Sequence, residues 1–222
     1  MKVLIVANGE SPSATVAEEA ARNSDLIVAT DGGVFAAAKL KLLPDILTGD
    51  MDSVLVDNAL ELFPKLRVIP TPDQDYSDLE KAVDIASQFG ATSIVVIGAT
   101  GRRPDHTLAN LALLRTLSSS FDIKFADNYG DTWHIGAALD SEAPESCIEI
   151  STDLGDTISL IATDVSTVVS VEGVQWDLEN FELIPGTHGV SNVATGRSVL
   201  VKVTRGSLYV CRLRLDILDT ME

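Results

Sequence analysis

Short apolar runs alternate with stretches of helical periodicity over about the first 135 residues. Val3–Ala7 and Ser93–Ile97 are continuous apolar runs, which is typical of strands buried on both faces of a parallel sheet. Between them, four apolar residues follow the spacing of a helix with one buried face: Leu79, Ala82, Val83 and Ala86. Alternating strands and helices predict parallel βαβ units joined by right-handed crossovers.

One predicted helix differs from the others in its pattern. Residues Pro104–Leu117 are apolar almost all round the helix, so we expect this helix to be well buried. Three further short strands are predicted in the same half of the chain: Leu26–Ala29, Ile46–Leu47 and Arg67–Ile69.

The pattern changes after Gly136. The small, polar segment Gly136–Ser146 reads as a linker, and only strand-like runs follow it. These runs are Cys147–Ile150, Thr157–Ile161, Val165–Val171, Phe181–Ile184, Ser198–Val203 and Ser207–Leu213. The sequence therefore predicts an N-terminal α/β domain over residues 1–140 and a C-terminal all-β domain over residues 147–222.

Composition narrows the class of protein. The 222 residues include 16 Lys and Arg against 33 Asp and Glu, a formal net charge of −17. Such a chain is a poor partner for nucleic acid or an anionic membrane, because both require a basic face. No apolar run is long enough for a signal peptide or a membrane span. The two cysteines, Cys147 and Cys211, form no CxxC and are expected to be buried thiols of a soluble, cytoplasmic protein.

Two acidic loops follow predicted strands. Asp31-Gly32-Gly33 follows one strand, and Gly49-Asp50-Met51-Asp52-Ser53 follows the next. Ligands of open parallel sheets bind outside the carboxyl ends of the strands, so these carboxylates are expected to converge. Carboxylates with phosphate oxygens and water are the ligands that Mg²⁺ prefers. The alternative is ordinary turn chemistry, which also favours Asp-Gly pairs.

A third acidic segment surrounds a helix start. Ser77 and Glu80 form the pattern of a capping box, and Asp78 in the first turn complements the helix dipole. Capping does not explain why Asp73, Gln74 and Asp75 crowd before the helix. Like charges so close together repel unless a cation lies among them.

Two arginines follow the predicted strand at Ser93–Ile97. Arg102 and Arg103 precede Pro104, which suits the first position of a helix, and a helix start beside arginine is a good phosphate site. The segment is not a Walker A loop. A simple turn with two solvated arginines is the alternative. Together the segments favour a polyphosphate bridged to carboxylates by Mg²⁺.

These segments, taken in order, resemble the thiamine pyrophosphokinase family. The matching motifs are DGG at Asp31–Gly33, PDILTGDMDS at Pro44–Ser53, TPDQDYSDLEKA at Thr71–Ala82, GRRPDHTLANL at Gly101–Leu111, GDTISLIA at Gly155–Ala162, GVQWDLEN at Gly173–Asn180 and GVSN at Gly189–Asn192. The resemblance implies an α/β nucleotide-binding domain, a C-terminal β-sandwich and a homodimer with thiamine near the subunit interface. It implies transfer of the terminal pyrophosphate of ATP to the thiamine hydroxyl, giving thiamine diphosphate and AMP.

The resemblance also implies roles for individual residues. Those expected around Mg²⁺ and the phosphates are Asp31, Asp50, Asp52 and Asp78. Gln74 and Arg103 would contact ATP, Asp105 would line the reacting region, and Trp176 with Ser191 and Asn192 would hold thiamine. An aromatic face suits the cationic thiazolium. Asp78 and Asp105 are the candidate general bases, although a carboxylate bound to metal is a poor base.

The chain departs from the family pattern at three places. Ser77 replaces a usual Thr, Val34-Phe35 follow the DGG where a small residue and Asn are common, and Arg102 replaces a common Gly and offers a phosphate contact. Two other functions keep the same fold. One is a pyrophosphokinase for another hydroxymethyl heterocycle such as a pterin, and the other is a non-catalytic thiamine diphosphate or nucleotide sensor. Trp176 with Ser191-Asn192 argues against the first, and the complete set of acidic residues argues against the second.

Overall fold

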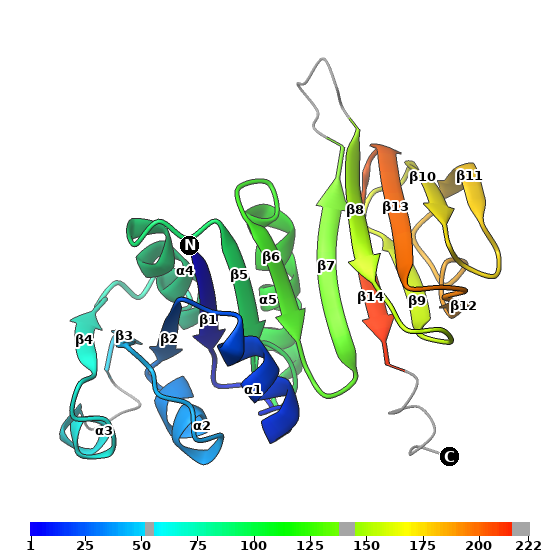
Figure 1. The fold of residues 1–222 in the computed structure, drawn as a ribbon. Helices are drawn as coiled ribbons and strands as arrows, with labels where there is room; N and C mark the ends of the chain where they lie inside the picture. Colours follow the sequence, from blue (N-terminus) through cyan, green and yellow to red (C-terminus); the bar gives the residue numbers. More distant parts are fainter. Residues whose placement is uncertain (52–55, 138–144, 215–222) are drawn as a thin grey trace. The chain divides into compact units, whose positions relative to one another are not determined.

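The structure is a computed structural model, and it describes residues 1–51, 56–137 and 145–214 (Figure 1). It divides into two compact units, which meet in the sequence between Asn128 and Tyr129. Strand β7 (Gly130–Gly136) pairs in antiparallel register with β14 (Ser207–Leu213). Residues that the sequence pattern groups with the α/β half therefore hydrogen-bond inside the β unit.

The first unit is built on a parallel sheet in the order β6-β5-β1-β2-β3-β4. Its strands are β1 (Lys2–Val6), β2 (Leu26–Thr30), β3 (Ile46–Gly49), β4 (Arg67–Pro70), β5 (Ser93–Ile97) and β6 (Asp122–Ala126). The chain runs outward from β1 to β4 and then returns to place β5 on the other side of β1. The strand order therefore reverses between β1 and β5, and open α/β sheets bind ligands at the carboxyl ends of the strands at such a point.

Five helices flank this sheet within the described residues: α1 (Ala14–Arg22), α2 (Gly33–Lys39), α3 (Val56–Leu62), α4 (Asp78–Gln88) and α5 (Pro104–Leu117). Ser77 caps α4, as predicted, because its Oγ accepts a hydrogen bond from the Glu80 N–H at 3.3 Å. The predicted apolar face of α4 is fully buried at all four positions. That face packs against β2 and β3 and so fixes where the N-terminus of α4 lies.

The predicted burial of α5 was wrong, although its limits were correct. Leu114 is its only buried residue, and Leu108 is 69% exposed. A helix that is apolar all round presents only one stripe to its own sheet, so the remaining apolar surface stays open in a single chain.

The second unit is a sandwich of two antiparallel sheets. One has the order β12-β9-β14-β7 and the other β11-β10-β13-β8. The strands not yet given are β8 (Ser146–Ser151), β9 (Thr157–Ala162), β10 (Thr167–Glu172), β11 (Leu178–Leu183), β12 (Asn192–Val193) and β13 (Ser198–Arg205). Alternate residues from both sheets form one apolar core, which includes Val199, Val201, Leu208 and Val210.

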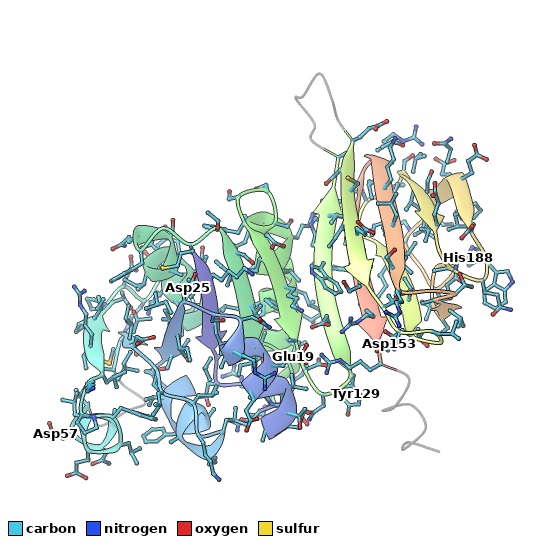
Figure 2. All side chains as sticks on the ribbon, in the orientation of Figure 1. Glu19, Asp25, Asp57, Tyr129, Asp153 and His188 are labelled. Atoms are coloured by element: carbon cyan, nitrogen blue, oxygen red, sulfur yellow. The ribbon has the colours of Figure 1, made fainter. Side chains whose placement is uncertain are left out.

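The acidic residues divide between the surface and the interior. Glu19, Asp25, Asp57 and Asp153 are exposed, so they contribute to an acidic surface (Figure 2).

The expectation of two buried thiols was wrong, since Cys147 is exposed and Cys211 is half-buried. Among the described residues, no helix combines the length and apolarity that crossing a membrane requires.

Candidate functional site

Three predicted metal ligands come together at one edge of the first unit. Asp31 follows β2, Asp50 follows β3, and Asp78 begins α4; one carboxylate oxygen from each lies within 4.8 Å of the others. The neighbouring strands β2 and β3 bring the first two together, and the packing of α4 on these strands adds the third. We refer to these residues as the carboxylate cluster. The fourth predicted ligand, Asp52, lies outside the described residues.

Asp31 is the most buried member of the cluster, at 1% exposure. Its Oδ1 accepts the Gly32 N–H at 2.6 Å, while no donor among the described residues reaches the buried Oδ2. Two other buried carboxylates lie beside Arg212. Asp131 Oδ2 is 2.6 Å from Arg212 Nη2, and Asp156 Oδ2 is 3.9 Å from Arg212 Nε. Asp31 instead has carboxylates beside it, which is unfavourable unless a cation joins them.

The environment raises the pKa of Asp78 from 3.8 to about 6. Burial is the main cause, and the negative charge of Asp31 adds to it, whereas the ammonium of Lys81 opposes the shift. Lys81 is 6% exposed, with its Nζ 3.7 Å from Asp78 Oδ1. This lysine was not among the predicted site residues, although its i, i+3 spacing from Asp78 was a usable signal.

Gly49 allows the close approach of β3 to Asp31. Its φ is +150°, and a Cβ there would lie 2.9 Å from the Cβ of Asp31. A larger residue would force the end of β3 away from the carboxylate cluster.

Arg103 and Asp105 form an exposed ion pair at the start of α5. Arg103 Nη2 lies 2.5 Å from Asp105 Oδ2. This hydrogen bond is the main reason that the pKa of Asp105 falls to about 2, and the same pair raises the pKa of Arg103. So acidic a carboxyl group is a weak base near neutral pH.

The other predicted ATP contacts lie in loops of the same unit. Gln74 is exposed between β4 and α4. Arg102 is also exposed, and its Nη1 donates to Asn8 O at 3.0 Å and to Asn8 Oδ1 at 3.1 Å.

A cavity of about 550 Å³ is lined by α4, the segment before it and the end of α5. Its lining includes Tyr76, Lys81, Asp84, Leu117 and Phe121. The buried Lys81 borders both this cavity and the carboxylate cluster.

In the second unit, Asn192 holds the backbone at Trp176. The Trp176 N–H donates to Asn192 Oδ1 at 3.2 Å, and Asn192 Nδ2 donates to Trp176 O at 2.8 Å. The Trp176 residue itself is 57% exposed. Beside this pair, Ser191 has a φ of +68°, and its N–H donates to Ser159 Oγ at 3.0 Å.

The histidines are not brought into this site as a group. His188 lies in the loop between β11 and β12 (Figure 2), His106 is exposed in α5, and His134 lies in β7.

Comparison with known proteins gives two family matches. Residues 17–125 match the family described as "Thiamin pyrophosphokinase, catalytic domain". Residues 145–208 match "Thiamin pyrophosphokinase, vitamin B1 binding domain". Together the two matches cover most of the chain.

Individual proteins agree with these matches. Thiamin pyrophosphokinase 1 of Caenorhabditis elegans is 29% identical over 95% of this chain and 89% of its own length. Among solved structures, thiamine pyrophosphokinase from Bacillus subtilis has a TM-score of 0.80 at 22% identity, covering 97% of this chain and 100% of that one. The yeast enzyme has a TM-score of 0.76 at 19% identity, covering 100% of this chain and 89% of that one.

Proposed function

Because the chain belongs to the thiamin pyrophosphokinase family, we propose that it transfers the terminal pyrophosphate of ATP to thiamine. The thiamine hydroxyl oxygen forms a bond to the β-phosphorus as the bond from that phosphorus to the bridging oxygen of AMP breaks. The hydroxyl proton is released, and the products are thiamine diphosphate and AMP. The observation that carries this proposal is the carboxylate cluster, in which Asp31 is buried beside two other carboxylates.

The residues of the cluster fit Mg²⁺. Three carboxylates with one buried, unbonded oxygen are a suitable donor set for a hard cation that also keeps water and phosphate ligands. We propose Asp31, Asp50 and Asp78 as ligands, with Asp52 as a fourth. When bound, the ion would neutralise charge on the transferred phosphates.

Arg103 is the residue that we propose for the second source of positive charge. In this structure its guanidinium is paired with Asp105, and both side chains are more than 60% exposed. Exchange of this carboxylate for a phosphate oxygen would keep a charge-assisted hydrogen bond. Asp105 would then remain beside the reacting groups, while Gln74 and Arg102 supply further contacts to ATP.

The site supports catalysis by positioning and charge neutralisation. The low pKa of Asp105 and the metal-ligand role proposed for Asp78 make both carboxyl groups poor general bases. Phosphoryl transfer needs little proton abstraction when the reacting groups are held in line and the charge is neutralised.

For the second substrate, we propose that Trp176, Ser191 and Asn192 contribute to the thiamine site. An exposed indole suits the cationic thiazolium ring. We further propose a homodimer with thiamine near the subunit interface. The exposed apolar side of α5 at Leu108, together with the Leu117 and Phe121 wall of the 550 Å³ cavity, supports coverage by a second copy.

An AMP-release assay with ATP and Mg²⁺, run with and without thiamine, tests the proposed reaction. We expect AMP only when thiamine is present, together with an equal amount of thiamine diphosphate. AMP release with a hydroxymethylpterin but not with thiamine would replace the proposed acceptor. No AMP release, combined with thermal stabilisation by thiamine, would indicate a binding protein.

A further inference from the structure

The segment Gly155–Ala162 matches a family motif but holds none of the residues proposed to bind ATP, Mg²⁺ or thiamine. It contains β9, whose side chains in the apolar core are Ile158, Leu160 and Ala162. Ser159 lies between these positions, so its side chain is on the other face of the strand. It is nevertheless only 5% exposed. A buried hydroxyl group needs a hydrogen-bonding partner, and here the partner indicates what the serine does.

The hydroxyl of Ser159 bonds to the backbone of Ser191. The Ser191 N–H donates to Ser159 Oγ at 3.0 Å. The antiparallel pairing of β12 with β9 stops at Asn192 and Ile158, so Ser191 lies just beyond the last pair. At this point the side chain of Ser159 provides the acceptor that a backbone carbonyl provides within a sheet.

Ser191 forms a tight turn between two points that are fixed to β9. On one side, Gly189 O accepts the Leu160 N–H at 2.8 Å, and a Cβ at Gly189 would lie 2.4 Å from Leu160 O. On the other side, Asn192 pairs with β9. Between them, Ser191 has a φ of +68°, a left-handed conformation that serine seldom adopts. The hydrogen bond to Ser159 is therefore the contact that stabilises the turn at its least favourable residue.

We propose that Ser159 is a positioning residue of the thiamine site, because its hydroxyl holds the turn that presents Ser191 and Asn192 to thiamine. This inference rests on the proposed function and deepens it. Ser159 acts through the backbone of Ser191, whose own side chain is exposed and available to a ligand. A site that is ordered before thiamine arrives loses less freedom on binding, so the hydrogen bond contributes to affinity.

Ser159→Ala tests this role, because it removes the acceptor and leaves the rest of the strand in place. We expect the Kd for thiamine to rise about tenfold, measured by titration calorimetry on the full chain. The KM for thiamine should rise by a similar factor, while the KM for ATP and the kcat at saturating thiamine stay unchanged. This division is the signature of lost substrate binding with intact chemistry.

Ser170→Ala is the matched control. Ser170 lies in β10, and its Oγ accepts the Asn180 N–H at 2.9 Å. Asn180 also has a positive φ, of +47°. Both variants thus remove a serine hydroxyl that supports a left-handed residue in the same unit, and we expect similar small decreases in melting temperature. Only Ser159→Ala should weaken thiamine binding.

Hydrogen exchange at the Ser191 amide gives a second measurement, made without thiamine. The exchange should become faster in Ser159→Ala and stay unchanged in Ser170→Ala. Unchanged thiamine affinity in stably folded Ser159→Ala, or an equal loss of affinity in Ser170→Ala, would overturn the proposal. Wild-type protein that needs Ser159 to bind thiamine but releases no AMP would contradict the proposed reaction and leave this positioning role intact.

Discussion

The buried carboxylates of the described chain show what distinguishes Asp31. Asp131 and Asp156 lie beside Arg212, so each buried charge has a basic neighbour. Asp31 lies beside Asp50 and Asp78 instead. Burial of mutually repelling charges costs stability, and a bound cation would convert this repulsion into attraction. Folding of this edge and binding of the metal are therefore linked through one residue.

Asp31→Asn tests that link. We expect turnover to fall about 100-fold or more, because a metal ligand is lost. The melting temperature in metal-free buffer should rise, because one repelling charge is removed while Oδ1 still accepts the Gly32 N–H. AMP release and thermal unfolding with and without Mg²⁺ measure both effects. Glu19→Gln, at an exposed position of α1, should change neither, and Asp31→Asn with near wild-type turnover would refute the metal assignment.

The raised pKa of Asp78 makes the stability of the fold depend on pH in a direction that can be worked out. Its pKa is about 6 in the folded protein against an ordinary value of 3.8, so the folded state holds the proton more tightly. Its contribution to stability is therefore complete below about pH 3.8 and is lost as the pH rises through about 6. After allowance for solvent screening of this half-exposed group, we expect its contribution to the free energy of unfolding to be about 1 kcal/mol.

This dependence is measured as a difference between two proteins. Denaturant unfolding of wild type and Asp78→Asn, in a chelating buffer at about pH 5 and about pH 7, removes the contributions of other groups. Wild type should lose stability relative to the variant as the pH rises. Saturating Mg²⁺ should reverse the sign, because the ion favours the ionised carboxylate. A flat difference in chelator would show that Asp78 does not carry the raised pKa.

At the scale of the elements, the short strand β12 helps to fix the loop between β10 and β11. Both polar ends of the Asn192 side chain bond to the backbone of Trp176. Gln175 N–H also donates to Val193 O, at 2.8 Å. The loop is thus ordered through its backbone while the indole remains exposed. This arrangement suits a side chain that must contact a ligand rather than a core.

We predict that Asn192→Ala raises the KM for thiamine about tenfold and leaves the KM for ATP unchanged. The reason is the loss of order at Trp176. In a chain that already carries Trp176→Ala, Asn192→Ala should therefore raise the KM for thiamine hardly any further. Steady-state kinetics of wild type, the two single variants and the double variant form a double-mutant cycle. A full additional effect in the double variant would mean that Asn192 acts on thiamine independently of Trp176.

Most strands and helices could be predicted because buried runs and helical spacing are local properties, but β6, β7 and β12 were not among the predicted strands. The approach of Asp31 to Asp50 also followed, since the carboxyl ends of parallel strands share one edge. The exposure of α5 could not be predicted, because hydrophobic periodicity shows which residues are apolar but not which other elements cover them. Lys81 was overlooked because a helical lysine is usually solvated.

For the whole molecule, subunit mixing tests the proposed dimer. Asp31→Asn and Trp176→Ala are each expected to be nearly inactive at low thiamine. If each site combines the cluster of one copy with Trp176 of the other, every heterodimer carries one intact site out of two, and random exchange makes half of all dimers heterodimers. An equal mixture should then recover about one quarter of wild-type activity. No recovery after verified exchange of subunits would mean that both residues serve a site within one chain.

The placement of the cluster has a consequence for dynamics. Asp31 directly follows β2, a strand that is paired on both sides, so the amides of β2 exchange their hydrogens only when the sheet itself opens. Asp78 occupies the first turn of α4, and Asp50 lies in a loop, where opening costs much less free energy. Arrival of the cation would therefore slow amide exchange around Asp50 and Asp78 and leave β2 nearly unchanged. The sheet therefore holds one ligand in place, and we expect Asp50 and Asp78 to adjust their positions when the ion enters or leaves.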